Sequence, residues 1–446
     1  MSKIKPEPIS GFPEFLPDEQ ITFDWARDLI RRHYESFGFS PIETPAVERA
    51  EVLLAKGGND REIYGLHRLA EDESGGDADL ALHFDLTVPL ARYVAQYAGQ
   101  LAFPFRRYQI QPVWRGERPQ AGRYRQFYQC DIDVIGDGQL SLFNDAEMPA
   151  VISGIFSEME IGPFTIRINN RKVLRGLLAD IGLGDDEAEA IRAFDRIDKI
   201  GRANVAEQLR QLGATDEGVD RLLALADGTR STDEWMEWLE AQDVNETFAE
   251  GIAELRTVVA GVRAMGVPED HFRVDPGLAR GLDYYTGTIY ETRLDDHPEV
   301  GSICGGGRYE NLAENYTNRK LPGVGISIGL TRMLPRLFEA GVLTPGRSTS
   351  ARVLVSLFSP DQWADALKIG AALREAGIPT EVYAEKKKLK QQLKYAARKG
   401  HDLVVIAGPS ELEAGTVNLK DMREGGGQET VALDRLAEAV TEALGQ

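Results

Sequence analysis

Residues 114–133, with the sequence WRGERPQAGRYRQFYQCDID, bring four arginines and three acidic residues together. The planar guanidinium fork suits phosphate oxygens, so several arginines in one loop indicate a polyphosphate ligand. From Phe127 onward the alternation predicts a strand with Gln129, Asp131 and Asp133 on one face, because same-face residues repeat every two positions. On composition alone, a salt-bridged surface hairpin is an equally good interpretation.

Two shorter segments carry further groups that could hold a ligand. The segment LARGLDYYTG contains Arg280, Tyr284 and Tyr285. On pattern alone, a tyrosine pair before glycine is more typical of a strand that packs against a core. In the segment ALHFDLTVP, Asp85 and Thr87 offer a carboxylate and a hydroxyl, which can accept hydrogen bonds from an ammonium group. Asp85 would serve equally well as a helix cap.

Glycines are concentrated in residues 301–309 (GSICGGGRY) and 322–332 (PGVGISIGLTR). Neither the G-x-G-x-x-G spacing of a dinucleotide loop nor a Walker lysine is present. Glycines inside strands more often mark the close approach of a ligand or another backbone. Arg332 follows the second run directly.

The composition limits the classes of protein to consider. A chain of 446 residues is too long for one core, and its two cysteines and six histidines show no zinc-site spacing, so we expect no protein-bound metal. No apolar run approaches the roughly 20 residues of a membrane span, and the first residues lack a secretory signal. We therefore expect a cytoplasmic protein without a membrane partner, in a reducing compartment.

Charge is distributed unevenly along the chain. The net charge of −20 argues against a simple nucleic-acid coat, yet residues 386–399 are strongly basic and include Lys388, Lys390 and Lys394. Taken alone, this run favours a solvated helix face.

Three regions of the chain differ in the spacing of their apolar residues. Short apolar runs and helical stretches alternate up to residue 171, residues 172–268 have helical spacing, and strand patterns return from about residue 272. The helical region is therefore interpreted as an insertion into one mixed domain. After a linker, an alternation of strands and helices predicts a small sheet with helices packed on it. In this last region, residues 359–362 (SPDQ) predict a capping box at a helix start.

The order of residues in these segments resembles the histidyl-tRNA synthetases, a family of class II aminoacyl-tRNA synthetases. Residues 115–133 resemble the second class II motif, RGLDYY the family's own motif, and residues 322–332 the third class II motif. Residues 38–53 resemble the first motif, which builds a dimer interface. Residues 388–396 and 415–422 resemble the C-terminal anticodon-binding domain.

The resemblance implies a role for individual residues. Arg115 would bind the α-phosphate and the histidine carboxylate, and Arg280 would stabilise charge on the α-phosphate. Glu117 would lie near the adenine, and Arg332 would hold the γ-phosphate. The histidine pocket would comprise Asp85, Thr87, Arg115, Gln129, Asp133, Arg280, Tyr284 and Tyr285. The tRNA-binding candidates are Lys388, Lys390 and Lys394. His83 stands where the family more often has arginine, and we predict no role for it.

The implied fold is an α+β class II catalytic core, an antiparallel sheet flanked by helices, with a helical insertion and a C-terminal α/β anticodon-binding domain. Its expected parts are catalytic residues 1–171 and 269–345, the insertion 172–268 and the anticodon-binding domain 350–446. The implied function is histidine–tRNA ligase: a homodimer that uses ATP and Mg²⁺ to activate L-histidine and transfers it to tRNA(His). Two alternatives are a non-catalytic paralogue, such as the regulatory subunit of ATP phosphoribosyltransferase, and a class II enzyme for proline or threonine. The motif RGLDYY argues against both.

Overall fold

The computed structural model describes residues 5–55, 62–68, 79–118, 122–226, 228–279, 285–310 and 313–445. The chain divides into two compact units, one formed by residues 1–13 and 26–343 and the other by residues 14–25 and 344–446. Among the described helices, none combines the length and the apolar character that crossing a membrane requires.

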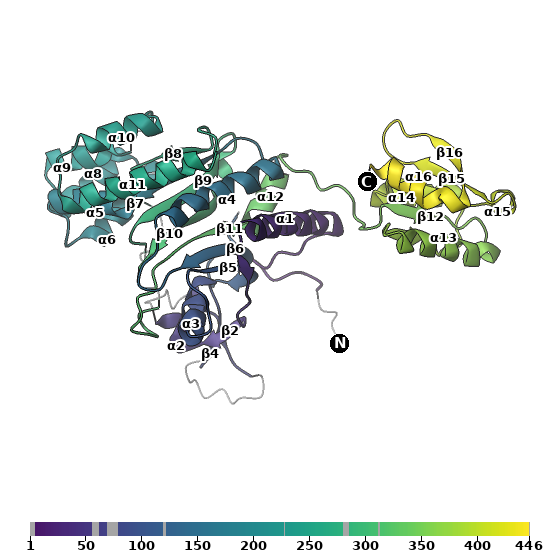
Figure 1. The fold of residues 1–446 in the computed structure, drawn as a ribbon, viewed down its shortest axis with the longest axis horizontal. Coiled ribbons are helices and arrows are strands. Elements are labelled where there is room, and N and C mark those ends of the chain that lie inside the picture. Colours follow the sequence, from purple (N-terminus) through teal and green to yellow (C-terminus); the bar gives the residue numbers. More distant parts are fainter. Residues whose placement is uncertain are drawn as a thin grey trace. The chain divides into compact units, whose positions relative to one another are not determined.

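The first unit is built on an eight-stranded sheet in the order β1-β5-β6-β11-β10-β9-β7-β8 (Figure 1). Its strands are β1 (Ser40–Pro41), β5 (Phe105–Trp114), β6 (Gln126–Ile135), β7 (Phe164–Asn170), β8 (Phe272–Val274), β9 (Thr288–Leu294), β10 (Ser302–Tyr309) and β11 (Gly323–Gly329). All neighbouring pairs are antiparallel except β1–β5 and β7–β8 at the two edges. The prediction of an antiparallel sheet flanked by helices is therefore confirmed, with parallel pairs only at its margins.

Helices cover one face of this sheet. The helices α4 (Phe143–Met159) and α12 (Leu330–Glu339) contact strands β6, β10 and β11, and the residues on that face are apolar and buried, such as Ile132, Ile326 and Ile328. Both cysteines, Cys130 and Cys304, are also buried there. Because side chains alternate along a strand, the other face is left to a different set of residues.

The same unit contains a small antiparallel sheet in the order β2-β4-β3. Its elements are β2 (Val47–Arg49), β3 (Gly65–Leu66) and β4 (Leu80–Leu82), with α2 (Ala50–Leu54) and α3 (Thr87–Tyr97) beside them. Val52, Leu53, Ala81 and Val88 form the core of this part. The helix α1 (Pro17–Ser36) precedes it in the chain.

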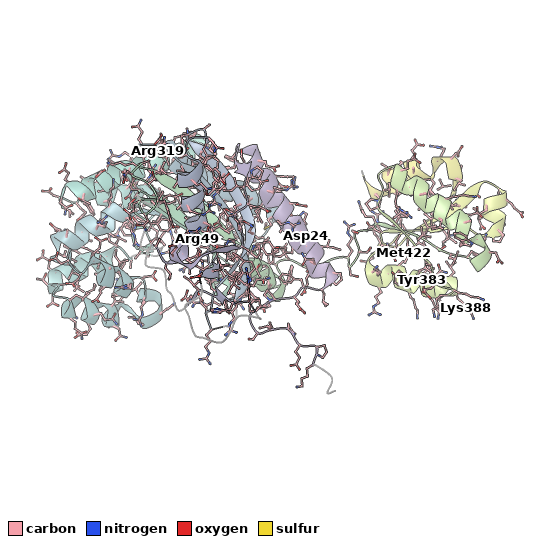
Figure 2. All side chains as sticks on the ribbon, turned by 90° about the horizontal axis from the view of Figure 1, so that it is seen from below. Asp24, Arg49, Arg319, Tyr383, Lys388 and Met422 are labelled. Atoms are coloured by element: carbon pink, nitrogen blue, oxygen red, sulfur yellow. The ribbon has the colours of Figure 1, made fainter. Side chains whose placement is uncertain are left out.

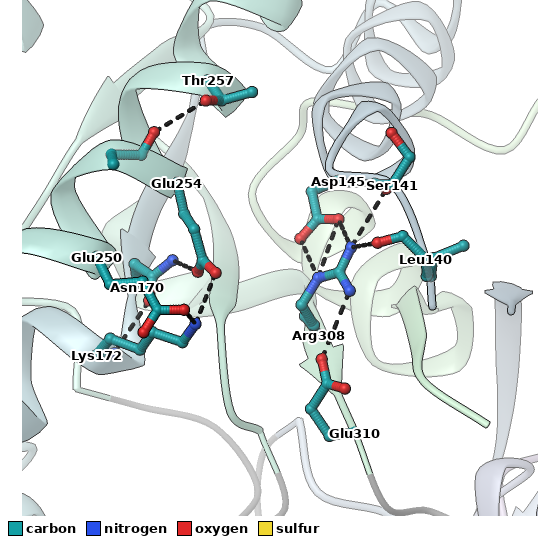
Figure 3. Close-up of polar contacts among 11 residues, drawn as sticks. Leu140, Ser141, Asp145, Asn170, Lys172, Glu250, Glu254, Thr257, Arg308 and Glu310 are labelled. Carbon is teal, nitrogen blue, oxygen red and sulfur yellow. Dashed lines mark hydrogen bonds and ion pairs between the residues drawn. The ribbon is translucent and has the colours of Figure 1, made fainter. Parts of the chain in front are cut away.

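Between β7 and β8 the described chain is helical, comprising α5 (Arg171–Asp180), α6 (Glu187–Phe194), α7 (Ile197–Ile200), α8 (Arg202–Gln211), α9 (Asp216–Ala224), α10 (Thr232–Glu240) and α11 (Glu246–Ala264). Where this segment leaves the sheet, Lys172 on α5 forms ion pairs with Glu250 and Glu254 on α11 at 2.5 and 2.6 Å (Figure 3). Asn170 caps α5 and also donates a hydrogen bond to Glu254. These contacts tie the first and last helices of the segment together.

Figure 3 also shows the buried ion pair between Arg308 on β10 and Asp145 on α4. The guanidinium contacts both carboxylate oxygens and donates further hydrogen bonds to the carbonyls of Leu140 and Ser141. Burial raises the pKa of Asp145, and Arg308 opposes that rise. Arg308 thus belongs to the helix-covered face of the sheet and fixes α4 against it.

The second unit has a five-stranded sheet in the order β13-β12-β14-β15-β16. Its elements are β12 (Val353–Val355), α13 (Trp363–Glu375), β13 (Thr380–Val382), α14 (Leu389–Lys399), β14 (Leu403–Ile406), α15 (Pro409–Glu413), β15 (Thr416–Asp421), β16 (Gln428–Ala432) and α16 (Leu436–Leu444). The first three strands are parallel, and the last two add antiparallel pairs. Figure 2 shows the side chains of this unit, with Tyr383 and Lys388 labelled.

One local prediction in this unit is wrong. Residues 359–362 do not form a capping box: Pro360–Gln362 make a 3₁₀ turn, and α13 begins at Trp363 with no side-chain hydrogen bond at its cap. The proline fits the tighter turn as well as a first helical position, so the pattern did not distinguish the two.

Candidate active site

The strand β6 forms the floor of the candidate site. Gln129, Asp131 and Asp133 lie on the same face of this strand, which confirms the predicted alternation. Their cross-strand neighbours are Gln111, Gln109 and Arg107 on β5 and Gly329, Ser327 and Gly325 on β11. This polar row lies on the face of the sheet opposite α4 and α12.

Asp133 is held from two sides. Its Oδ2 atom is 2.5 Å from a guanidinium nitrogen of the fully buried Arg107, and its Oδ1 atom accepts a hydrogen bond of 2.9 Å from the hydroxyl of Tyr309. A Cβ atom on Gly325 would overlap with Oδ1, so only glycine fits there. Burial raises the pKa of Asp133, while Arg107 and Tyr309 oppose the rise. Both oxygens of this predicted histidine ligand thus already have protein partners.

Gln129 and Asp131 share one neighbour, the hydroxyl of Ser327. The amide of Gln129 donates to Ser327 Oγ at 3.0 Å. Asp131 is 3% exposed, and burial raises the pKa of its carboxyl to about 7. Arg107 and the Ser327 hydroxyl oppose the rise. In the described part of the chain, Oδ1 of Asp131 is buried without a hydrogen-bond partner.

Asp85 lies just before α3. Its Oδ1 atom accepts a hydrogen bond of 3.1 Å from the backbone N–H of Val88 in the first turn of the helix, although the cap position itself is occupied by Leu86. Burial raises the pKa of Asp85 to about 6; this backbone bond and the charges of Arg115 and Arg107 oppose the rise. The carboxyl of Asp85 therefore belongs to the same electrostatic cluster as Asp131 and Asp133.

Arg115 connects this cluster to the β5–β6 hairpin. Its Nε atom donates a hydrogen bond of 3.0 Å to the carbonyl of Phe84, and its guanidinium lies 5.0 Å from the ring centre of Phe127. Glu117 accepts a contact of 3.4 Å from Arg123. The hairpin is thus salt-bridged, and it also presents a guanidinium beside Asp85, so the two interpretations of its sequence are compatible.

Arg332 approaches the same hairpin from α12. The Thr331 hydroxyl accepts a hydrogen bond of 2.8 Å from the backbone N–H of Tyr128, which fixes the start of α12 against β6. A Cβ atom on Gly122 would lie 3.7 Å from Nε of Arg332, and one on Gly301 would lie 3.2 Å from its terminal nitrogen. Arg332 therefore lies between the hairpin and the chain entering β10. The glycines at both places leave room for its side chain.

Tyr285 packs beside the Asp133 side of the site. A Cβ atom on Gly307 would lie 2.9 Å from its ring, and it belongs to the group of partly buried residues around Tyr309. The two remaining predicted residues, Arg280 and Tyr284, lie outside the described residues. The structure thus places Asp85, Arg115, Gln129, Asp133, Tyr285 and Arg332 around strand β6 and the hairpin that leads into it. Thr87 follows Asp85 at the start of α3, and Glu117 lies in the hairpin.

Sequence analysis missed several members of this polar row: Arg107, Gln109, Gln111, Ser327 and Tyr309. The alternation in FRRYQIQ was a usable signal, because Arg107, Gln109 and Gln111 repeat every two positions. His83 is a buried packing residue: its Nε2 atom contacts the carbonyl of Pro112 at 2.8 Å, and its ring lies 5.4 Å from that of Trp114. Burial lowers its pKa.

The predicted tRNA-binding lysines are all in the second unit. Lys388 immediately precedes α14, and Lys390 and Lys394 lie on that helix. All three are exposed.

Comparison with known proteins gives a consistent result over nearly the whole chain. The family model described as histidyl-tRNA synthetase matches residues 11–333, and the model described as anticodon binding domain matches residues 352–443. A histidine–tRNA ligase from Xanthomonas campestris pv. campestris is 48% identical over 466 aligned positions, covering 99% of this chain and 97% of the relative.

The solved structures agree. The crystal structure of histidyl-tRNA synthetase from Nostoc sp. PCC 7120 superposes with a TM-score of 0.91 at 44% identity, covering 99% of this chain and 100% of the other. A structure from Bacillus halodurans C, described as an ATP phosphoribosyltransferase regulatory subunit/histidyl-tRNA synthetase, covers 88% of this chain and 97% of its own at 20% identity and a TM-score of 0.73, which shows a common fold alone. The chain therefore belongs to the histidyl-tRNA synthetase family and is a class II aminoacyl-tRNA synthetase.

Proposed function

We propose that the chain catalyses ATP-dependent activation of L-histidine to histidyl-adenylate and transfers the histidyl group to tRNA(His), at the site on the polar face of the eight-stranded sheet. The observation that carries the assignment of this site is the convergence of Arg115 and Arg332 on one hairpin, beside the carboxyl cluster of Asp85, Asp131 and Asp133. Guanidinium groups suit a triphosphate, and carboxylates suit an ammonium group.

In the first step, the histidine carboxylate attacks the α-phosphorus of ATP in line and pyrophosphate leaves. Catalysis of such transfers depends mainly on positioning and charge neutralisation. Arg115 would neutralise the α-phosphate and orient the histidine carboxylate, Arg332 would hold the γ-phosphate, and Arg280 would stabilise charge that develops on the α-phosphate. Glu117 would lie on the adenine side.

Mg²⁺ is proposed as the ion that accompanies ATP. Among the described residues, no three carboxylates, histidines or cysteines are grouped as a metal cage. Mg²⁺ usually keeps several waters and binds through substrate phosphates with one or two carboxylates, so the residues present suit an ion that arrives with the nucleotide. When bound, the ion would neutralise phosphate charge. In the second step a terminal ribose hydroxyl of the tRNA attacks the carbonyl carbon of the adenylate, so that an ester bond to the tRNA forms and AMP leaves. No protein general base is assigned to the proton of that hydroxyl.

Selectivity for histidine is proposed to arise in the pocket itself. Asp85 and Thr87 would hold the ammonium group, Gln129 would line the pocket, and Asp133, Tyr284 and Tyr285 would surround the imidazole. A pocket that pairs its buried polar groups with an imidazole leaves them unpaired when another amino acid enters. Since Asp133 contacts Arg107 and Tyr309 in the free protein, imidazole binding would add to this network or replace one of its bonds.

We propose catalytic residues 1–171 and 269–345, a helical insertion over residues 172–268, and an anticodon-binding domain over residues 350–446 that contacts tRNA through Lys388, Lys390 and Lys394. A cytoplasmic homodimer is proposed, with residues 38–53 at the dimer interface. Light scattering coupled to gel filtration measures the dimer directly.

The decisive experiment is ATP–pyrophosphate exchange with each amino acid in turn. We expect exchange with histidine alone, and its loss in an Arg280→Ala variant that retains the wild-type unfolding temperature. An absence of exchange with every amino acid would contradict the catalytic assignment and favour a regulatory paralogue. Near-normal exchange in the Arg280→Ala variant would remove the proposed role of that residue alone.

A further inference from the structure

Two buried polar side chains bind the loop that joins β8 to Arg280, residues 275–279. The side-chain amide of Asn169, on β7, donates hydrogen bonds of 3.0 Å to the carbonyl of Pro276 and of 2.9 Å to the carbonyl of Leu278. Arg171 donates one of 2.8 Å from its guanidinium to the carbonyl of Ala279. Asn169 is fully buried and Arg171 is 4% exposed. Because water is excluded, these carbonyls would lose their hydrogen bonds if the two side chains were removed.

The hydrogen bond to Ala279 acts directly on the backbone of Arg280. The carbonyl of Ala279 and the N–H of Arg280 belong to one peptide unit, and a peptide unit is planar. A donor fixed on this carbonyl therefore sets the direction in which the chain enters Arg280. Arg280 itself lies outside the described residues, whereas Ala279, which is covalently bonded to it, is 3% exposed.

Arg171 also contacts the chain where it returns to the sheet. Its backbone N–H donates a hydrogen bond of 2.8 Å to the carbonyl of Gly287, directly before β9. A Cβ atom on Gly287 would lie 2.8 Å from the side chain of Arg308, so the chain is closely packed at this position. One residue thus fixes the chain on both sides of residues 280–286. Of its two hydrogen bonds, only the one to Ala279 is made by the side chain.

The helical segment between β7 and β8 determines where Arg171 lies. Arg171 is the first residue of α5, and the residue that caps this helix, Asn170, donates a hydrogen bond of 2.7 Å to Glu254 on α11 (Figure 3). The residue after α9 contacts the same loop from another direction, since a Cβ atom on Gly277 would lie 2.9 Å from the carbonyl oxygen of Leu225. The helical segment therefore contacts the loop before Arg280 at two places.

We propose that Arg171 is a positioning residue for adenylate formation, which holds the carbonyl of Ala279 and so directs Arg280 at the α-phosphate. This proposal rests on the proposed ligase function, in which Arg280 stabilises charge that develops on the α-phosphate. Such stabilisation requires a donor that is already aimed at the position where the charge develops, so a rotation of the peptide before Arg280 weakens it. The helical segment would thus contribute to the activation of histidine, a step in which tRNA takes no part.

The test compares full-length Arg171→Ala with Lys172→Ala in histidine-dependent ATP–pyrophosphate exchange. In Arg171→Ala, kcat should fall by about tenfold or more, because small displacements of a catalytic group are costly. The KM values for histidine and ATP should stay within about twofold, as expected when an interaction made only in the transition state is lost. Lys172→Ala is the matched control: Lys172 is the next residue on α5, and its ion pairs are with Glu250 and Glu254 on α11. It should lower the unfolding temperature but leave kcat unchanged.

Three further variants separate hydrogen bonding from packing. Arg171→Lys keeps a cation with N–H donors and should recover part of the kcat that Arg171→Ala loses. Arg171→Met has a side chain of similar bulk without donors and should be as slow as Arg171→Ala. Asn169→Asp keeps the shape of the amide but removes the donor that serves Pro276 and Leu278, so it should also lower kcat. This variant tests the same loop if Arg171→Ala does not fold.

Wild-type kcat in folded Arg171→Ala, or equal kcat in Arg171→Lys and Arg171→Met, would overturn the proposal. So would an equal fall of kcat in Lys172→Ala, because the cause would then be looser packing of the helical segment. A higher KM for histidine at unchanged kcat would also overturn it, since the effect would then lie in the histidine pocket. An absence of exchange in the wild type would instead contradict the ligase function.

Discussion

The buried carboxyl of Asp131 should make the stability of the first unit depend on pH. Its pKa is about 7 in the folded chain, against an ordinary value of 3.8. Between these two values the folded chain holds a proton that the unfolded chain has released. The stabilisation is therefore complete below pH 3.8 and is lost as the pH rises through 7.

The size of the effect follows from the two pKa values. Linkage gives a loss of about 2–3 kcal/mol in the free energy of unfolding between roughly pH 5 and pH 8 for this one carboxyl. Asparagine cannot titrate, so Asp131→Asn should lack this component of the pH dependence. Asp85 and Asp133, whose pKa values burial also raises, remain in both proteins and largely cancel in the comparison.

The assay is urea unfolding of wild type and variant at both pH values. The transition of the first unit should be followed separately, because a chain with two units does not have to unfold in one step. Ser327→Ala is a second variant: it removes a hydrogen bond that lowers the pKa of Asp131, so the loss of stability should move to higher pH. If the pH dependence of Asp131→Asn matches that of the wild type to within about 0.5 kcal/mol, the carboxyl is not protonated as argued.

Three further outcomes are expected. Arg308→Ala should lower the free energy of unfolding by about 3–5 kcal/mol, measured by urea denaturation, because it leaves a fully buried carboxylate without its partner; a change below 1 kcal/mol would contradict this account. Gly325→Ala should raise the KM for histidine in the exchange assay, since the added methyl overlaps with the carboxylate of Asp133 and with the backbone carbonyl of Ile132 and so displaces both; an unchanged KM would separate Asp133 from the histidine pocket. Replacing Lys388, Lys390 and Lys394 together by glutamine should reduce the slope of log Kd for tRNA against log salt concentration by about 2, while ATP–pyrophosphate exchange persists. Equal loss of tRNA binding and of exchange would indicate misfolding.

Local periodicity explains what could be predicted from the sequence. The shared face of Gln129, Asp131 and Asp133 followed from the two-residue repeat of a strand. The partners of that face depend on strand order, because β11 lies next to β6 although about 190 residues separate them in the chain. The contacts of Asp133 with Arg107 and Tyr309 could not be predicted, because they depend on that strand order.

The features that were not predicted also depend on contacts between residues far apart in the sequence. The strands β15 (Thr416–Asp421) and β16 (Gln428–Ala432) were not predicted, because most of their residues are polar and four of the five residues of β16 are exposed. They pair by hydrogen bonds with β14 and with each other, which composition does not reveal. The approach of Arg332 to Gly122 likewise depends on the tertiary fold, and only the family resemblance pointed to Arg332.

The placement of both cysteines under the helices has a practical consequence. Burial raises the pKa of Cys130 and of Cys304, so each sulfur stays protonated and out of reach of alkylating reagents in the folded chain. Only the thiolate reacts readily. A cysteine introduced on the surface would therefore be the one site that a maleimide dye labels, and paired dyes on the two units would report their separation during aminoacylation without removal of any native residue.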